Sequence, residues 1–212
     1  MRTRVKICGI TKVRDLENAV QLGADAIGFN FYPGSSRYLP PKQAKRLLDA
    51  MPPLMEAVGV VVGITPAEAL HLFEQHPGLS AVQWHGESKA LFALSKRWIQ
   101  AWAVGSAQDL AGLSDHLQKP ALASSLPKAL LLDAKVKGLH GGTGKTLPWD
   151  LLHGWKSPLP IILAGGLVPE NVAQAIESVQ PYGVDVASGV ESTPGAKDLG
   201  KMRAFMDAVK GK

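Results

Sequence analysis

The chain has 212 residues, of which 46% are apolar and 19% are charged. This composition is typical of a folded protein with a sizeable core, and it excludes intrinsic disorder. The formal net charge of +5 is spread over scattered basic residues, so it favours an anionic small substrate and gives no reason to expect a nucleic-acid partner.

Neither a membrane span nor an export signal is expected. No apolar run approaches the roughly 20 residues of a transmembrane helix. The start of the chain, MRTRVKICGI, lacks the apolar core and cleavage site of a signal peptide. The single cysteine cannot form an internal disulfide or a multi-cysteine metal site. We therefore expect a cytoplasmic protein that binds no membrane.

Eight apolar stretches with the character of strands recur along the chain: 4–8, 26–32, 57–62, 81–85, 100–104, 129–133, 160–165 and 183–188. Helix signals lie between them. Thr65, Pro66 and Glu68 have the spacing of a capping box, Gly23 follows a helical segment and Pro169 begins another. Strands that alternate with helices form a parallel sheet, and eight of them predict one (β/α)8 TIM barrel over residues 1–212.

In such a barrel the active site lies at the carboxyl ends of the strands. Four side chains with useful chemistry are expected there, namely Cys8, Arg37, His85 and Asp133. The glycine-rich turns after the last two strands are typical phosphate sites, because small residues let backbone N–H groups approach phosphate oxygens. The candidate phosphate-binding residues are Gly165, Gly166, Ser188 and Gly189.

The segment GGTGKT at 141–146 looks like part of a nucleotide-binding P-loop. The pattern G-x-x-x-x-G-K-[ST] would place its first glycine at position 139, which is Leu139. Pro148 should begin a helix, which would leave Lys145 in the loop before it. We therefore expect no nucleotide site, and we assign glycines such as Gly142 to a loop that folds over a ligand.

Alternation along the first strand places Arg4, Lys6 and Cys8 on the face that points into the barrel. At about 7 Å and an effective dielectric of about 20, the Lys6 charge would lower the pKa of the thiol by about one to two pH units. Burial would raise the pKa, so the net direction stays open. Asp185, on the neighbouring last strand, also points inward and is expected to pair with Lys6 or Arg4 in a supporting role.

Cys8 and Asp133 together offer a general base and a general acid. Each also has a structural reading, an inert buried thiol for Cys8 and a loop cap for Asp133. The sequence shows neither a metal-ligand cluster nor a dinucleotide fingerprint, so we expect no metal and no cofactor. The class of reaction that fits these features is a cofactor-free proton transfer on a phosphorylated sugar.

Seven motifs between residues 4 and 198 carry a specific resemblance. They are VKICGIT, SSRYL, VQWHG, LLLDA, HGGTGKTLPWDLL, LAGGLVPENV and GVDVASGVESTPGAKD. In this order they resemble the phosphoribosylanthranilate isomerase family of tryptophan biosynthesis. The resemblance implies an Amadori rearrangement of N-(5′-phosphoribosyl)anthranilate to 1-(2-carboxyphenylamino)-1-deoxyribulose 5-phosphate.

The resemblance also implies roles for individual residues. Asp133 would protonate the ribose ring oxygen, which requires a raised pKa that a dry barrel mouth can supply. Cys8 would take the C2′ proton, and Arg37 would lie near the anthranilate carboxylate. Lys6 and His85 are further substrate-binding candidates, and the loop with Gly142 would help to cover the substrate.

Other phosphosugar barrels remain as alternatives. An indole-glycerol-phosphate synthase would need lysine and glutamate chemistry at strand ends, and a ribulose-phosphate epimerase would need a metal site. A histidine-pathway isomerase performs the same rearrangement but uses aspartates in both catalytic roles, which Cys8 argues against. A phosphate-binding barrel without turnover is the non-enzyme alternative. A monomer is expected ahead of a homodimer.

Overall fold

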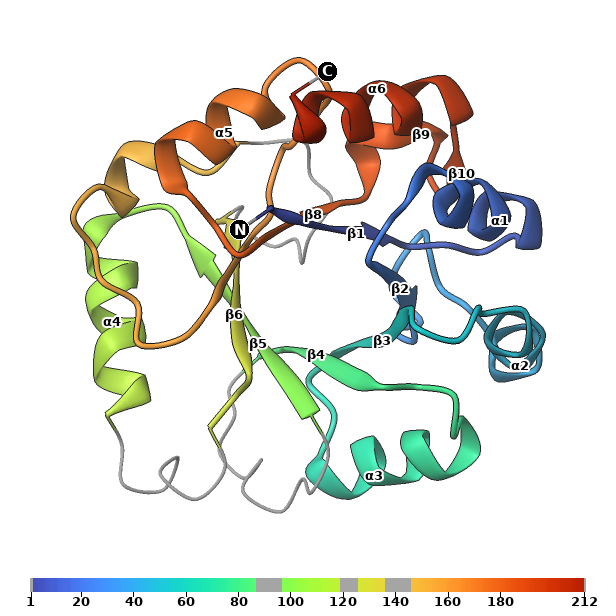
Figure 1. Cartoon of the computed structure of the whole chain (residues 1–212). Helices are drawn as coiled ribbons and strands as arrows, with labels where there is room; N and C mark the ends of the chain where they lie inside the picture. Colours follow the sequence, from blue (N-terminus) through green and yellow to red (C-terminus); the bar gives the residue numbers. More distant parts are fainter. Residues whose placement is uncertain (1, 87–96, 119–125, 136–145, 212) are drawn as a thin grey trace.

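The structure is a computed structural model that describes residues 2–86, 97–118, 126–135 and 146–211. Its eight main strands are parallel and form a closed barrel in chain order, with the last strand paired to the first (Figure 1). The strands are β1 (Arg4–Cys8), β2 (Ala26–Asn30), β3 (Glu56–Val62), β4 (Ala81–His85), β5 (Arg97–Val104), β6 (Ala129–Ala134), β7 (Ile161–Leu163) and β8 (Gly183–Val186). The predicted (β/α)8 barrel is confirmed.

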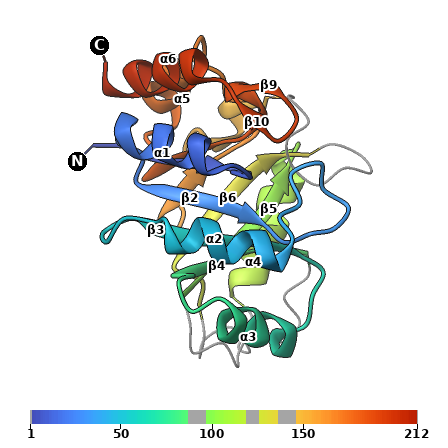
Figure 2. The ribbon, with the colours of Figure 1, turned by 90° about the vertical axis from the view of Figure 1, so that its right-hand side faces the viewer.

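Helices cover the outside of the barrel, as Figures 1 and 2 show. They are α1 (Val13–Leu22), α2 (Pro41–Asp49), α3 (Pro66–Gln75), α4 (Ala107–Leu117), α5 (Val172–Val179) and α6 (Leu199–Lys210). Two short 3₁₀ helices, Trp149–Leu152 and Ser188–Val190, follow β6 and β8, and a hairpin of β9 (Glu191–Thr193) and β10 (Ala196–Lys197) precedes α6. In the described part of the chain, no helix has the length and apolar character needed to cross a membrane.

The local helix signals behave as the sequence predicts. Thr65 caps α3, and its hydroxyl and the Glu68 carboxylate bind each other's backbone N–H groups in a capping box. Gly23 ends α1 in the left-handed conformation at φ 86°. Pro148 differs slightly from the prediction, because it precedes a 3₁₀ helix at the cap position and does not occupy its first turn.

Alternation within each strand divides the barrel wall into two faces. On β1, Val5 and Ile7 are buried in the large core between the sheet and the helices. A smaller apolar cluster, formed by Ala101, Leu131 and Ala164, is separate from this core. Two other side chains of β1, Lys6 and Cys8, take the inward face together with Asp185 of β8. Cys8 and Asp185 reach the pocket at the carboxyl ends of the strands.

Candidate active site

A pocket of about 420 Å³ opens at the carboxyl ends of the barrel strands. Figure 2 shows that the β9–β10 hairpin lies on this side of the barrel, towards which β2 points. The structure brings most of the predicted site residues together in the pocket lining, namely Cys8, Arg37, His85, Asp133, Gly165, Gly166, Asp185 and Ser188.

Cys8 and Lys6 converge over the inner face of Gly28, which pairs with Cys8 across the β1–β2 ladder. A Cβ atom at position 28 would lie 2.7 Å from Cys8 Sγ and 3.0 Å from Lys6 Nζ. Only glycine therefore leaves room for both groups. Lys6 Nζ also donates a hydrogen bond of 2.8 Å to Asp185 Oδ1, and both side chains are buried. Lys6, one of the two partners expected for Asp185, therefore makes this contact.

Burial decides the protonation state of the Cys8 thiol. It raises the pKa of the thiol above the ordinary value, and the nearby charges of Lys6 and Lys197 offset only part of this increase. The lowering effect expected from Lys6 is present, but it is smaller than the effect of burial. The thiol is therefore protonated in the resting site at neutral pH.

Asp133 lies next to the end of β6, which is three strands from β1 around the closed barrel. Its Oδ1 accepts a 2.8 Å hydrogen bond from the backbone N–H of Ala134. Burial, assisted by the negative charge of Asp185, raises the pKa of Asp133 to about 6. The Ala134 N–H and the Lys6 charge act in the opposite sense but do not cancel this increase. A carboxyl group with such a pKa can give up a proton near neutral pH.

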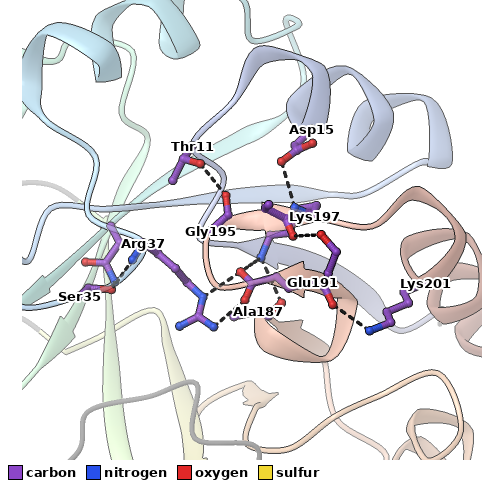
Figure 3. Close-up of polar contacts among 12 residues, drawn as sticks. Thr11, Asp15, Ser35, Arg37, Ala187, Glu191, Gly195, Lys197 and Lys201 are labelled. Atoms are coloured by element: carbon purple, nitrogen blue, oxygen red, sulfur yellow. Dashed lines mark hydrogen bonds and ion pairs between the residues drawn. The ribbon is translucent and has the colours of Figure 1, made fainter.

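The loop after β2 presents Arg37 to the pocket. The Ser35 hydroxyl organises this loop, because it accepts hydrogen bonds from Asn30 Nδ2 at 3.0 Å and from the Arg37 backbone N–H at 3.1 Å. The stem of Arg37 lies over Gly9, where a Cβ atom would be only 2.5 Å from Arg37 Cδ. The guanidinium donates to both carboxylate oxygens of Glu191, at 2.8 and 2.6 Å (Figure 3).

His85 ends β4 and lies beside Gln83 of the same strand, with 2.8 Å between His85 Nε2 and Gln83 Nε2. Gln83 is buried in the pocket wall. Its Oε1 accepts no hydrogen bond from any of the described residues. An amide oxygen of this kind is available to a hydroxyl group of a ligand.

The two glycine-rich turns at the phosphate end are packed against each other. Gly165 and Gly166 have left-handed backbones at φ 84° and 63°, and both line the pocket together with Ser188. Gly189 is needed for packing, because a Cβ atom there would lie 1.9 Å from the Leu167 carbonyl oxygen. The two turns therefore meet at the pocket wall, to which Gly165, Gly166 and Ser188 contribute.

Two predictions receive no structural answer. Gly142 and the rest of the predicted covering loop lie outside the described residues. The described residues contain no group of three His, Cys, Asp or Glu side chains that could hold a metal ion, and the expectation that no cofactor is needed stays a prediction.

Residues 5–208 match the family model described as N-(5′-phosphoribosyl)anthranilate (PRA) isomerase. The chain belongs to this family. A relative from Magnetococcus marinus named N-(5′-phosphoribosyl)anthranilate isomerase is 46% identical, with 99% of this chain and 96% of the relative covered. A second relative with the same name, from Pseudomonas fluorescens, is 42% identical, with 98% of each chain covered.

Solved phosphoribosylanthranilate isomerases share the fold. The crystal structure of the Thermotoga maritima enzyme superposes with a TM-score of 0.86 at 36% identity and covers 99% of this chain and 100% of its own. A second crystal structure is described as phosphoribosyl anthranilate isomerase in complex with reduced 1-(o-carboxyphenylamino)-1-deoxyribulose 5-phosphate. It has a TM-score of 0.83 at 35% identity, with 99% and 100% covered.

Among the polar residues that sequence reasoning missed are Gln83, in the pocket wall, and Glu191 and Lys197, in the charged cluster with Arg37. Alternation from His85 gave a signal for Gln83, because residues two apart on a strand share a face. Glu191 and Lys197 lie beyond the last barrel strand, where no periodicity predicts their direction. Their signal is chemical, since a buried arginine in a pocket requires a carboxylate partner.

Proposed function

We propose that Asp133 is the general acid and Cys8 the general base in the Amadori rearrangement of N-(5′-phosphoribosyl)anthranilate to 1-(2-carboxyphenylamino)-1-deoxyribulose 5-phosphate. The observation that carries this proposal is that both side chains line one pocket and that the pKa of Asp133 is raised to about 6. Membership of the isomerase family supports the reaction, which serves tryptophan biosynthesis.

The first step opens the ribose ring. Protonated Asp133 gives its proton to the ring oxygen, and the bond between that oxygen and C1′ breaks. The lone pair of the anthranilate nitrogen forms a C=N bond to C1′, which gives a protonated Schiff base. A carboxyl group whose pKa lies near the working pH is suited to this step, because a useful fraction carries the proton while the acid remains strong enough to release it.

The second step moves a proton from C2′. The Cys8 thiolate takes this proton, and the electrons of the C–H bond form an enolamine while neutralising the Schiff base nitrogen. The enolamine then tautomerises, with a proton gained at C1′ and one lost from the C2′ hydroxyl, so the product is an isomer of the substrate. The Lys6 ammonium and the positive Schiff base both favour the thiolate over the thiol that burial favours at rest.

The remaining site residues are proposed to bind the two ends of the substrate. Gly165, Gly166, Ser188 and Gly189 would receive the phosphate through backbone N–H groups. Arg37 would receive the anthranilate carboxylate through a charge-assisted hydrogen bond. His85 also lines the pocket and is proposed to contact the substrate. Lys6 is proposed to act through Cys8.

The test is steady-state conversion of phosphoribosylanthranilate by the parent protein and by the Asp133→Asn and Cys8→Ala variants. Each substitution is expected to lower kcat by at least about 10²-fold, which is the typical contribution of a general acid or base. Asp115→Asn, on the exposed surface of α4, is the matched control and should leave kcat unchanged. A folded parent without turnover would overturn the isomerase proposal, and a fully active Asp133→Asn variant would overturn the assignment of the acid.

We further propose that residues 1–212 form a single barrel catalytic domain and that it acts as a cytoplasmic monomer. A free catalytic thiol suits a reducing compartment such as the cytoplasm. One related structure is described as mutually generated monomers of the dimeric Thermotoga maritima enzyme. Sedimentation velocity tests the monomeric state, and a stable dimer would contradict it. Leu54 is a fully exposed apolar side chain, so dissociation of such a dimer by Leu54→Glu would place the interface at this residue.

A further inference from the structure

Glu191 lies behind Arg37 in a buried cluster of three charges. Its carboxylate accepts two hydrogen bonds from the Arg37 guanidinium and one of 2.8 Å from Lys197 Nζ (Figure 3). The exposed fractions of these side chains are 12% for Arg37, 4% for Glu191 and 0% for Lys197. Two positive charges and one negative charge leave the cluster with a net positive charge, and Arg37 is the member of the cluster that lines the pocket.

The backbone around Glu191 is anchored from several sides. Lys201 Nζ donates to the Glu191 carbonyl oxygen at 2.8 Å. The hairpin that Glu191 begins is held by the Lys197 N–H, which donates to Asp15 Oδ2 at 3.0 Å, and by the Thr11 hydroxyl, which donates to the Gly195 carbonyl oxygen at 2.7 Å (Figure 3). Glu191 is thus a fixed support to which the loop after β2 is attached.

The geometry leaves one edge of Arg37 open. Glu191 binds Nε and one N–H of Nη2, so three of the five N–H donors of the guanidinium face away from this contact. The hydrogen bonds to Glu191 raise the pKa of Arg37 further above its ordinary value. Burial alone would raise the pKa of Glu191, but Arg37 and Lys197 together hold it below its ordinary value. Arg37 and Glu191 therefore stay ionised. Burial lowers the pKa of Lys197 despite the nearby Glu191 carboxylate, to which Lys197 Nζ donates its hydrogen bond.

We propose that Glu191 is a positioning residue that aims the open edge of Arg37 at the carboxylate of the ligand, and that Lys197 offsets the charge of Glu191. This inference rests on the proposed function, in which Arg37 binds the anthranilate carboxylate. Without Lys197, the negative charge of Glu191 would oppose the binding of a second carboxylate at the same guanidinium. Lys197 Nζ also donates to the Ala187 carbonyl oxygen at 3.1 Å, which ties the carboxylate end to the turn after β8.

The test compares two ligands in the parent and in Glu191→Gln. The first probe is the reduced form of the product, 1-(2-carboxyphenylamino)-1-deoxyribulose 5-phosphate. The second probe is the same compound without its carboxyl group. Calorimetry should show about 10- to 100-fold weaker binding of the first probe to Glu191→Gln, which is the range for a lost hydrogen bond to a charged group. Affinity for the second probe should change by less than about threefold, because this probe has no carboxylate for Arg37 to bind.

Glu177→Gln, on the exposed face of α5, is the matched control and should bind both probes like the parent. In steady-state assays Glu191→Gln should raise KM more than it lowers kcat, because Arg37 holds a part of the substrate that does not react. Combining Glu191→Gln with Arg37→Ala should weaken the carboxylated probe no further than Arg37→Ala alone, since Glu191 acts through that side chain.

An equal loss of affinity for both probes would overturn the inference, because Glu191 would then support the pocket as a whole. Unchanged affinity for both would overturn it as well. If the parent itself does not discriminate between the probes, the proposed role of Arg37 fails and the inference fails with it. If Glu191→Gln does not fold, Lys197→Met provides the test, because it leaves the Arg37–Glu191 pair intact. This variant should bind the carboxylated probe severalfold more weakly than the parent and bind the other probe equally well. If the parent and the variant bind both probes with the same affinities, the inference is overturned.

Discussion

At the scale of single residues, the site holds Asp133 in surroundings that oppose its ionisation. The carboxyl group is largely removed from water, and the negative Asp185 lies in the same pocket. One hydrogen bond from a backbone N–H supports the charged form, which is fewer than a strongly stabilised carboxylate would receive. The same surroundings that make Asp133 an acid must therefore reduce the stability of the folded chain once Asp133 ionises.

Asp133→Asn should consequently stabilise the fold at neutral pH. The carboxyl group ionises near its ordinary value of 3.8 in the unfolded chain, whereas the folded chain keeps the proton until about pH 6. As the pH rises between these values, ionisation favours the unfolded state, and the penalty is complete above about pH 6. The shift corresponds to about 1 to 3 kcal/mol in the free energy of unfolding. Urea denaturation at pH 4 and pH 7 measures it.

The variant and the parent should differ little at pH 4 or below and most at pH 7, with the variant more stable. Asp115→Asn is the control for loss of an exposed carboxylate and should follow the parent at both values. A parent and an Asp133→Asn variant with the same dependence of stability on pH would show that Asp133 has an ordinary pKa, and the argument for a general acid would lose its main support.

At the scale of elements, the turn after β7 determines the space available to the Asp133 side chain. Gly165 has φ 84°, and a Cβ atom there would lie 2.5 Å from the Ala134 backbone nitrogen and 2.9 Å from Asp133 Oδ1. A side chain at this position would therefore push β6 and β7 apart at the point where Asp133 is held. Gly165 has a steric role in addition to its proposed role at the phosphate.

Gly165→Ala is expected to lower the free energy of unfolding by about 2 to 4 kcal/mol, because backbone strain and a backbone clash add. It should also lower kcat more than tenfold by displacing the Asp133 carboxylate. Gly154→Ala separates the two causes, since Gly154 has a similar φ of 74° but no atom within 4 Å of an added Cβ. That control should cost only about 1 to 2 kcal/mol and leave kcat unchanged. Equal effects of the two substitutions in both assays would contradict the steric argument.

The same scale shows why part of the site could be predicted from the sequence. A period of two along a strand predicted that Lys6 and Cys8 share the inner face and that Asp185 meets them, and the structure has this arrangement. The alternation of side chains applies only within the strands and predicts nothing for the loops that follow them. The contact between Arg37 and Glu191 joins residues 154 positions apart through two irregular segments, so no local pattern announces it.

The direction of the Cys8 pKa shift could not be predicted for a different reason. The Lys6 charge and burial act in opposite senses, and the outcome depends on how fully the thiol is removed from water. Alternation predicts which way a side chain points, but the degree of burial depends on the side chains of neighbouring strands. The presence of glycine at position 28 beside the thiol is one such detail.

At the scale of the whole molecule, the buried ion pair lies where the first and last strands meet. Lys6 and Asp185 are partners in the β1–β8 ladder that closes the barrel, and their charged atoms are 2.8 Å apart. A buried ion pair contributes little net stability, because the cost of removing both charges from water offsets their attraction. Two apolar residues of similar volume could close the barrel equally well.

We therefore expect the pair to be dispensable for closure but not for catalysis. Asp185→Asn should lower the free energy of unfolding by about 3 to 5 kcal/mol, because it leaves the Lys6 charge buried without a counter-charge. The double variant Lys6→Met/Asp185→Leu removes both charges and should unfold within about 1 kcal/mol of the parent, or later. Its kcat should nevertheless fall by at least about 10²-fold, because Cys8 loses the ammonium group that favours the thiolate.

Two measurements on the parent and both variants separate the role of the ion pair in closure from its role in catalysis. Urea unfolding gives the stability, and the rate of Cys8 alkylation as a function of pH reports the state of the thiol. In the double variant the thiol should react only at higher pH than in the parent, since burial remains while the Lys6 charge is gone. A double variant as unstable as Asp185→Asn would show that the barrel needs the ion pair for its closure. A stable double variant with full activity would show that Lys6 has no part in the mechanism and is not the group that favours the Cys8 thiolate.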